Sequence, residues 1–423
     1  MRNNLKQFDL AIVGGGIIGC ATAMLAKRML PASTRVVLIE KENTVGFHQS
    51  GRNSGVVHMG LYYKPNSLKA RLCQEGAFET FAYCDSQKIP YKKCGKLVVA
   101  INQSELGRLE NLFQNSINNG VPDVRILENK QEIQRVEPNC EGISAIYSPY
   151  TAIVDWKVVT ESFRQSFLKM GGEMMLNFEL IELRQSPQSS QIFPIVLKSK
   201  KGQSIRSRYV LTCCGLFSDR VAKLSGSSLE PKIVPIRGEY LGLPQRVARG
   251  LLSTNIYPVP DPKFPFLGVH FTPRMDGSLW LGPNAVFASH REGYSYFDIS
   301  LRDTLELIAY PGFRKLSSRY IMKGLDELTS SVFSRRQIRI LQKYVPKLPA
   351  SEVYRVSAGV RAQALTIDGK LVDDFVFDSG VSSEAEGCRI LHVRNAPSPG
   401  ATSSLAIAKY LLDKMQKSFL NLT

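Results

Sequence analysis

The sequence predicts an α/β fold in which a domain with a parallel, Rossmann-like sheet is interleaved with a mainly antiparallel α+β domain. Three observations predict it: a glycine-rich turn between a strand and a helix near the N-terminus, a second strand-to-glycine turn at 209–219, and short strand-like runs broken by proline and glycine over 233–283. At 423 residues the chain is long enough for two domains. We expect the first domain over 1–90, 146–230 and 350–423, and the second over 91–145 and 231–349.

The first turn carries the pattern of a dinucleotide site. A β-rich apolar run at Phe8–Val13 is followed at once by the glycine-rich stretch 14–19 and by a helical pattern that ends at Met29. Gly14 permits the tight turn, Gly16 lets the backbone approach a pyrophosphate, and Gly19 allows the helix to pack closely on the strand. The helix N-terminus adds free N–H groups and a partial positive charge. We therefore expect a nucleotide pyrophosphate at this turn.

The second strand supports the same expectation. It covers Val36–Ile39 and ends in Glu40, which stands 21 positions after Gly19. A carboxylate at that place reaches the ribose hydroxyls and disfavours a 2′-phosphate. The chain then runs through small and polar residues at 46–55, which can wrap a cofactor with backbone and hydroxyl donors.

The later elements follow in order along the chain. The pattern predicts strands and helices, alternately, at 96–101, 105–119, 146–154, 156–170 and 173–180. Asp155 is placed to cap the second of these helices. After the strand at 209–214 and Gly215, Asp219 begins a helix, either as a helix-terminal charge or as a cofactor contact. The C-terminal part is expected to form a helical segment, a strand and a last helix at 300–347, 389–393 and 404–415.

Composition limits the classes of partner. The net charge is +17, and residues 301–350 carry ten Lys or Arg against four acids, so this segment is locally basic. No basic–aromatic interleaving of the kind that stacks single strands is present, and we expect no nucleic-acid partner. No apolar run approaches the roughly 18 residues of a spanning helix. The eight cysteines show no C-x-x-C spacing, so we expect no metal site and a reducing compartment.

Several stretches resemble one family of flavoproteins. The stretch 46–55 resembles the second FAD-contacting loop of the D-amino-acid-oxidase-like flavoproteins. The chain resembles the L-2-hydroxyglutarate dehydrogenases, which belong to that superfamily, at 54–65, 265–274, 280–285, 358–363 and 392–399, and the match extends from Phe8 to about Met415. The resemblance implies a two-dinucleotide-binding-domain flavoprotein fold, an FAD cofactor, and oxidation of L-2-hydroxyglutarate to 2-oxoglutarate. An amino-acid oxidase or a glycerol-3-phosphate dehydrogenase-like enzyme of the same superfamily is the alternative.

The resemblance also carries expectations about contacts and location. It implies a mitochondrial enzyme that passes electrons to an unidentified acceptor, such as a membrane quinone or an electron-transfer protein. A cytoplasmic location is the alternative, because the first strand begins by Phe8 and leaves no room for a full transit peptide. The expected FAD contacts are Gly14, Gly16, Gly19, Glu40, Lys41, Ser50, Asn53, Ser54, Gly55, Leu180, Gly215, Asp219, Gly400, Ala401 and Thr402. The turn at 400–402 would aim N–H groups at the flavin.

The chemistry needs a base for the substrate hydroxyl, and histidine is the usual choice. Of five histidines, His58 matches a family motif and is the first candidate, and His270, in the middle of a predicted strand, is the second. The third, His392, is expected either to bind substrate or to be a satisfied core histidine.

A small dicarboxylate needs cationic partners, and arginine offers bidentate geometry. Arg237, Arg361 and Arg274 are the candidates, and of these we expect Arg237 and Arg361, together with Tyr62 and His392, to bind the substrate. An arginine in an apolar strand needs an anionic partner, which is either the ligand or an internal Asp or Glu. A basic helical segment near 335–347 could also dock on an anionic membrane.

Overall fold

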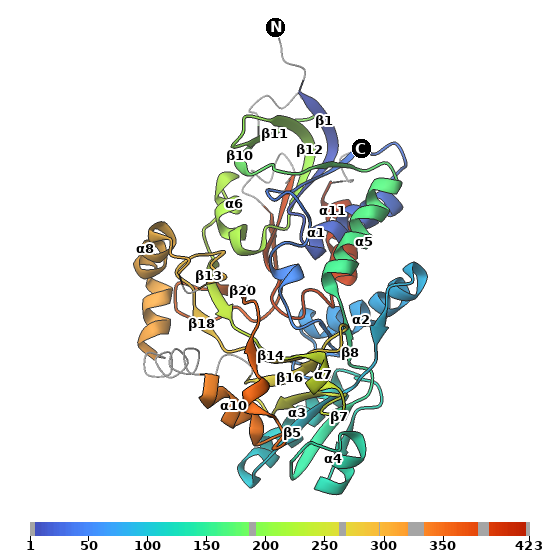
Figure 1. Ribbon diagram of the computed structural model, residues 1–423. Coiled ribbons are helices and arrows are strands. Elements are labelled where there is room, and N and C mark those ends of the chain that lie inside the picture. Colours follow the sequence, from blue (N-terminus) through green and yellow to red (C-terminus); the bar gives the residue numbers. More distant parts are fainter. Residues whose placement is uncertain are drawn as a thin grey trace.

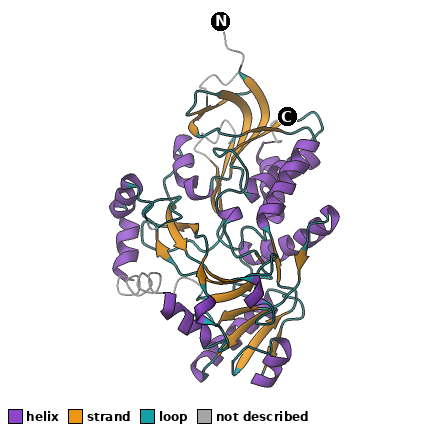
Figure 2. Cartoon of the chain, in the orientation of Figure 1, coloured by secondary structure: helices purple, strands orange, loops and turns teal. Residues whose placement is uncertain are grey.

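The computed structural model describes residues 5–185, 192–261, 268–295, 297–319, 334–379 and 389–419. Within them the chain forms two large sheets, one at each end of the molecule, with two small sheets between or beside them (Figures 1 and 2). Residues 265–267 of one resembling stretch, and 320–333 of the predicted helical segment, lie outside the described residues.

The first large sheet has a parallel centre in the order β9–β2–β1–β12–β22. β11 pairs antiparallel with the first half of β12, and β10 pairs antiparallel with β11. β21 pairs antiparallel with β22. Its strands, in chain order, are β1 (Lys6–Val13), β2 (Val36–Ile39), β9 (Glu173–Met175), β10 (Leu180–Gln185), β11 (Ile195–Ser199), β12 (Ser204–Thr212), β21 (Val376–Ser379) and β22 (Ile390–Asn395).

Helices cover this sheet because its strands are apolar on both faces. Leu10 and Ile12 of β1 pack into the core under α1 (Ile17–Met29), whereas Ala11 and Val13 face a second core on the other side. α1 packs against α5 (Trp156–Lys169) and α11 (Ser404–Phe419). α6 (Ser218–Leu224) follows β12 and contacts β10 and β22. The predicted parallel, Rossmann-like domain is therefore confirmed.

The second large sheet has the order β19–β14–β17–β16–β15–β5–β7–β6. Every pairing in it is antiparallel except that of β15 with β5. Its strands are β5 (Lys96–Ala100), β6 (Arg125–Leu127), β7 (Ser144–Ser148), β14 (Leu241–Leu243), β15 (Asn255–Pro258), β16 (His270–Pro273), β17 (Leu279–Gly282) and β19 (Tyr354–Arg355). The mainly antiparallel character predicted for this part is also confirmed.

The remaining elements connect the two sheets or flank them. The small sheets are β18–β13–β20, with β13 (Lys232–Gly238), β18 (Val286–Phe287) and β20 (Gly359–Leu365), and β3–β8–β4, with β3 (Val56–Val57), β4 (Tyr91–Lys92) and β8 (Ala152–Val154). The other helices are α2 (Leu68–Gln87), α3 (Leu106–Asn118), α4 (Lys130–Val136), α7 (Gln245–Ala248), α8 (Leu301–Ala309) and α10 (Ser334–Gln342). No helix in the described ranges is long and apolar enough to cross a membrane.

Three predicted elements differ from the structure. The strand expected at 146–154 is two strands, β7 and β8, which belong to different sheets. The strand expected at 173–180 is also two, because β9 pairs with β2 and β10 pairs with β11, and Asn177 between them has a positive φ of 55°. The segment 300–347 is interrupted at Tyr310, since a residue before proline is disfavoured in the helical region.

Helix α2 is an element that the sequence analysis did not anticipate. Its buried residues include Gly76 and Thr80, so its buried surface has no simple apolar stripe. A Cβ on Gly76 would lie 2.5 Å from the Thr402 carbonyl oxygen, which shows how closely α2 approaches the last turn of the first domain.

The predicted division into domains remains a proposal. Because Ser144–Ser148 pairs with β5 and β6, we propose that the second domain extends to residue 148 and not only to 145.

Candidate functional site

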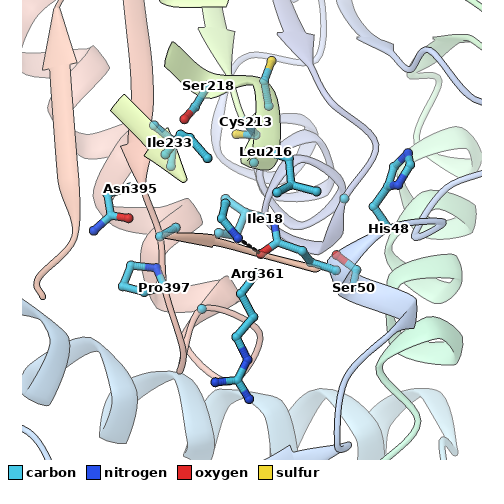
Figure 3. A pocket seen from close by; sticks show the side chains of 18 of the residues that line it. Ile18, His48, Ser50, Cys213, Leu216, Ser218, Ile233, Arg361, Asn395 and Pro397 are labelled. Carbon is cyan, nitrogen blue, oxygen red and sulfur yellow. Dashed lines mark hydrogen bonds between the residues drawn. The ribbon is translucent and has the colours of Figure 1, made fainter. Parts of the chain in front are cut away.

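A cavity of about 1520 Å³ lies where segments far apart in the sequence meet. Its lining comes from the first glycine turn, the segment after β2, the turn after β12, strand β20 and the turn before α11. Figure 3 shows Ser50, Cys213, Ser218 and Asn395 around one part of this cavity, and Arg361 extends away from them toward another part. The cavity therefore has room for an extended cofactor and for a smaller molecule beside it.

The first glycine turn has the geometry that the sequence predicts. Gly14 has a φ of 109°, and a Cβ there would lie 2.4 Å from the Cys213 carbonyl oxygen. Gly16 is the N-cap of α1 and lines the cavity, and the Ile17 N–H donates to Ser50 Oγ at 2.8 Å. Gly19 does not line the cavity; a Cβ on it would lie 1.9 Å from the Gly14 carbonyl oxygen. Gly14 thus serves the tight turn against the chain that follows β12, Gly16 faces the cavity, and Gly19 serves helix packing.

Glu40 lies at the end of β2 and lines the cavity. Its Oε2 accepts the Gly15 N–H at 2.5 Å, and its Oε1 accepts the Glu42 N–H at 2.9 Å. These two bonds hold the carboxylate next to the glycine turn, where it can face ribose hydroxyls.

Lys41 lines the cavity within a cluster of charged side chains. Its Nζ lies 2.6 Å from a carboxylate oxygen of both Glu42 and Glu292, and His48 Nε2 lies 2.9 Å from the same two oxygens. Glu42, His48 and Glu292 place ligand atoms within 4.8 Å of one another, as in a metal site. Lys41 already supplies positive charge between the two carboxylates, so the cluster is satisfied by side chains alone.

The segment after β2 shapes the next part of the wall. Ser50, Asn53 and Ser54 line the cavity. Asn53 Nδ2 donates to the carbonyl oxygens of residues 49 and 50, and Asn53 Oδ1 accepts the Gly55 N–H at 2.9 Å. Gly55 itself lies outside the lining, and a Cβ there would lie 2.6 Å from Arg274 Nη1. Arg274 donates to the Asn53 carbonyl at 3.1 Å and so supports the segment from behind.

The other expected cofactor contacts reach the cavity from distant elements. Leu180, Gly215, Gly400, Ala401 and Thr402 all line it. A Cβ on Gly215 would lie 2.9 Å from Gln49 Nε2, and a Cβ on Gly400 would lie 2.8 Å from the Ala396 carbonyl oxygen. Both positions therefore require a residue without a side chain.

Asp219 lines the cavity, but its carboxylate is bonded to other groups of the protein. Arg291 Nη1 and Nη2 lie 2.5 and 2.8 Å from its two oxygens, and the Ile233 N–H donates to it at 3.1 Å. Asp219 and Arg291 are both buried. Of the two roles that the sequence left open, the geometry supports an internal ion pair at the start of α6.

His58 lines the cavity and is held at both backbone atoms. Its N–H donates to Thr402 Oγ1 at 3.1 Å, and its carbonyl oxygen accepts from Cys73 Sγ at 3.3 Å. Its Nδ1 lies 3.3 Å from Nζ of Lys96, which is fully buried. Burial, and then the charge of Lys96, lower the pKa of His58 well below 6.5, so its neutral form is favoured. A neutral imidazole is the form that can accept a proton.

Tyr62 and Arg361 present polar groups to the cavity that have no partner among the described residues. The Tyr62 hydroxyl is buried and forms no hydrogen bond within the described part of the chain. The Arg361 guanidinium, which Figure 3 shows in the pocket, has no hydrogen bond or ion pair with any described residue. A buried or half-buried donor without a partner favours a ligand with complementary oxygens.

Besides Gly19 and Gly55, three residues expected to act in catalysis or substrate binding lie outside the cavity lining. Arg237 is buried, its Nε lies 3.1 Å from Glu239 Oε1, and its Nη1 donates to the Ser295 carbonyl at 2.9 Å. His392 forms hydrogen bonds of 2.8 Å with Thr212 Oγ1 and with Ser225 Oγ, so both ring nitrogens are used. These contacts do not favour substrate binding by either residue: Arg237 belongs to an internal ion pair, and for His392 they favour the second expected role, that of a satisfied core histidine.

The third residue outside the lining is His270, the second candidate base. Its Nδ1 donates to the Gly268 carbonyl at 3.0 Å, and its ring stacks on Tyr257 with centroids 4.0 Å apart. Burial lowers its pKa to about 3, so it holds a proton poorly. His270 is therefore a packed residue behind the cavity lining, whereas His58 reaches the cavity.

Lys96 is the residue at this site that the sequence analysis missed. It begins β5, whose other residues are all apolar, and it is fully buried. A lysine on the same strand face as Val98 and Ala100, both in the core, breaks the apolar pattern. That interruption is the signal in the sequence that would have identified Lys96, because burying an ammonium without a partner costs free energy.

The donor set and shape of the cavity fit a dinucleotide cofactor. Gly14 and Gly16 line the cavity, the N-terminus of α1 faces it, and Glu40 follows β2 at the place from which a carboxylate reaches ribose hydroxyls. Gly14, Gly16, Glu40 and the turn at 400–402 would hold it.

Comparisons with known proteins agree with this geometry. Residues 9–414 match the family model described as FAD dependent oxidoreductase. The chain is 49% identical to the human protein named "L-2-hydroxyglutarate dehydrogenase, mitochondrial", over 98% of this chain and 90% of the relative. It is 50% identical to the protein of the same name from Nematostella vectensis, over 98% and 91%.

Two solved structures show the same fold at low identity. L-alpha-glycerophosphate oxidase from Mycoplasma pneumoniae has a TM-score of 0.75 and 21% identity, with 96% of this chain and 94% of that chain covered. Glycine oxidase from Geobacillus kaustophilus has a TM-score of 0.70 and 19% identity, with 98% and 95% covered.

Proposed function

Because the chain belongs to the FAD-dependent oxidoreductases, in the family of the L-2-hydroxyglutarate dehydrogenases, we propose that it oxidises L-2-hydroxyglutarate to 2-oxoglutarate. The observation that supports this most directly is the pairing of a neutral histidine with an unpaired arginine in one cavity. His58 supplies an acceptor for a hydroxyl proton, and Arg361 supplies a cation for a carboxylate.

In the proposed mechanism the cofactor accepts the hydride, and protein side chains take the proton and bind the substrate. Bound FAD supplies the acceptor for the hydride that leaves C2 of the substrate. His58 Nε2 takes the proton of the C2 hydroxyl, because Nδ1 is engaged with Lys96. Arg361 binds a carboxylate of the substrate, and the Tyr62 hydroxyl donates to a second oxygen. The turn at 400–402 lines the cavity and contacts the His58 backbone through Thr402 Oγ1. Its N–H groups, apart from that of Gly400, which donates to Pro397, would stabilise negative charge there.

The substrate assignment is tested by anaerobic bleaching of the flavin absorbance of the purified protein. We expect L-2-hydroxyglutarate to bleach the flavin, and D-2-hydroxyglutarate, L-lactate and a panel of amino acids to bleach it far more slowly. Selective bleaching by an amino acid would replace the proposed reaction by that of an amino-acid oxidase. Absence of bleaching by every hydroxy acid would also contradict it.

The partner that takes the electrons is proposed to lie at a membrane. α8 carries an exposed apolar stripe of Leu301, Leu305 and Ile308, which are 73%, 56% and 55% exposed, and Phe297 just before it is 92% exposed. Spacing of four and three residues places the three on one helix face. Figure 1 shows α8 at the periphery, away from both large sheets. Exposed apolar side chains on a helix of this kind are typical of a membrane-surface contact.

Exposed basic residues within α8 and after it in the chain favour an anionic lipid surface. Arg302 is 76% exposed within α8, and exposed Arg314 and Arg319 follow in helical residues 311–319. Exposed Arg335 and Arg339 lie on α10, in the segment that the sequence predicted for this role. Basic residues near an anionic surface contribute about 1 kcal/mol each. A quinone or an electron-transfer protein at the mitochondrial inner surface is the kind of acceptor that this position suits, as the mitochondrial names of the relatives suggest.

Vesicle binding tests the membrane contact. We expect sedimentation with vesicles that contain phosphatidylglycerol, weaker binding to pure phosphatidylcholine, and loss of binding as salt is raised. The double substitution Leu301→Asp, Leu305→Asp should weaken binding at least about tenfold, because two apolar side chains no longer enter the lipid. Val158→Asp, at an exposed apolar position of α5, is the matched control and should bind as the wild type does. Equal binding by the double variant would contradict the proposal.

A further inference from the structure

The His58–Lys96 pair is an unusual arrangement at the base of the cavity. Lys96 Nζ lies 3.3 Å from His58 Nδ1 and is enclosed by two aromatic rings, with 4.2 Å to the Tyr257 centroid and 5.2 Å to the Tyr62 centroid. Lys96 forms no ion pair with a carboxylate in the part of the chain that the structure describes. A buried lysine without a counter-ion favours its uncharged amine form.

The surroundings of the pair disfavour a second positive charge. Arg361, His270 and Lys69 all act on His58 from neighbouring elements, and Lys69 is itself paired with Asp373 at 2.8 Å. On the other side, Lys96 faces the thiols of Cys73 and Cys94.

The charged form of Lys96, an ammonium, is less disfavoured than the charged form of His58, an imidazolium. Burial lowers the pKa of Lys96 to about 7, whereas burial and the charge of Lys96 keep the pKa of His58 well below 6.5. The faces of two aromatic rings attract an ammonium, and this partly offsets its burial. Of the two groups, Lys96 therefore holds a proton more readily.

We propose that Lys96 is the positioning residue of the active site: as an uncharged amine it accepts the Nδ1–H of His58, which leaves Nε2 free to take the substrate proton. This inference rests on the proposed oxidation and deepens it by naming where the proton goes. A neutral imidazole carries one N–H, so the hydrogen bond at Nδ1 decides whether Nε2 can act as a base.

The step balances without an additional reagent. The O–H bond of the substrate breaks and its proton bonds to His58 Nε2, while the C2–H bond breaks and the hydride leaves to FAD, so a C=O bond forms. The Nδ1–H proton of His58 moves to Lys96 Nζ, which becomes an ammonium. His58 ends as the other neutral tautomer, and no imidazolium persists in the buried site.

A protonated Lys96 would have the opposite effect. An ammonium donates to Nδ1, which forces the imidazole proton onto Nε2 and removes the acceptor from the cavity. The base form therefore exists above the pKa of Lys96 and is lost as pH falls through about 7. We expect kcat/KM for L-2-hydroxyglutarate to rise with pH through this value.

Two substitutions of Lys96 distinguish its proposed role as a proton acceptor from a purely structural role as a cation. Lys96→Met removes the acceptor, and we expect kcat to fall roughly ten- to a hundredfold, the range seen when the partner that orients a metal-ligating histidine is lost. The rise near pH 7 should disappear with it. Lys96→Arg keeps a cation of similar reach that never deprotonates. It should lock the unproductive tautomer and lower kcat more than Lys96→Met does, toward the ~10⁴-fold loss that a wrong tautomer causes in a serine-protease triad.

Lys69→Met provides the control. It removes another lysine whose charge acts on His58 but which is bonded to Asp373 and not to the imidazole. The rise in kcat/KM near pH 7 should remain. If Lys96→Arg retained wild-type kcat, or if Lys96→Met kept the same pH profile, Lys96 would be a structural residue and the proposal would be wrong.

The tautomer of His58 can also be measured without substrate, which tests the role of Lys96 independently of the proposed reaction. In holoenzyme labelled with ¹⁵N-histidine, His58→Gln identifies the His58 signals, and we expect the Nδ1–H tautomer above about pH 8 and the Nε2–H tautomer below about pH 6. An Nε2–H tautomer throughout this range would overturn the proposal even if both Lys96 variants failed to fold. If L-2-hydroxyglutarate does not bleach the flavin, the proposed substrate is wrong, but this tautomer measurement still decides the role of Lys96.

Discussion

His58→Gln is expected to lower kcat for L-2-hydroxyglutarate by about 10²–10⁴-fold, the contribution of a positioned acid–base group. The hydroxyl proton then has no acceptor, because His270 donates its Nδ1–H to Gly268 and does not line the cavity. The flavin spectrum should be retained, since none of the glycine-turn contacts involves the His58 side chain. Steady-state and anaerobic reduction kinetics measure the effect.

His270→Gln is the variant that distinguishes the two candidate bases. Because the His270 ring is buried against Tyr257, its replacement should lower thermal stability and change kcat much less than His58→Gln does. A larger loss of kcat in His270→Gln than in His58→Gln would reverse the assignment.

Arg361→Met should raise KM for L-2-hydroxyglutarate by about 30- to 4000-fold. Loss of a hydrogen-bonded charge partner of a ligand costs about 2–5 kcal/mol, and each 1.4 kcal/mol is a factor of ten. The pH profile of kcat should keep its shape, because the His58–Lys96 pair is left in place. Substrate titration of the initial rate gives the two constants separately.

Arg237→Met is the matched control, since it removes an arginine from the neighbouring strand. Its buried ion pair with Glu239 would be broken, which should lower the free energy of unfolding by about 3–5 kcal/mol. KM of the folded fraction should stay near the wild-type value. If Arg237→Met raised KM and Arg361→Met did not, the carboxylate partner would be Arg237.

Arg237 and Arg361 show why choosing arginine as the carboxylate-binding residue type did not identify which arginine lines the cavity. Both were selected because each stands in an apolar strand pattern, and both strands are present. In the antiparallel pair of β13 and β20, Ile236 is opposite Arg361 and Arg237 is opposite Val360. Because opposed residues share a sheet face, Arg237 and Arg361 point to opposite faces. The pairing register, which a single sequence does not reveal, decided which arginine reaches the cavity.

The histidines required tertiary information for a similar reason. His392 is in the strand where it was expected, but Thr212 and Ser225, which use both its nitrogens, come from other elements. His58 and Lys96 stand 38 positions apart, and Lys96 looked like the first residue of an ordinary strand. The pair exists because β5 places Lys96 against Tyr257 and beneath the cavity.

The sequence by itself determined the glycine turn and Glu40, because these depend on backbone requirements within some thirty consecutive residues. The apolar strand patterns, read separately in three segments, predicted the parallel domain. Gly14 needs a positive φ, and Gly19 needs close contact with the turn. Each requirement selects glycine at that position, so it is visible in the sequence. The tertiary structure decided which polar side chains keep a free group for a ligand. A buried charge must find a partner, and whether that partner is Glu239, Asp373 or a substrate depends on strand register and burial.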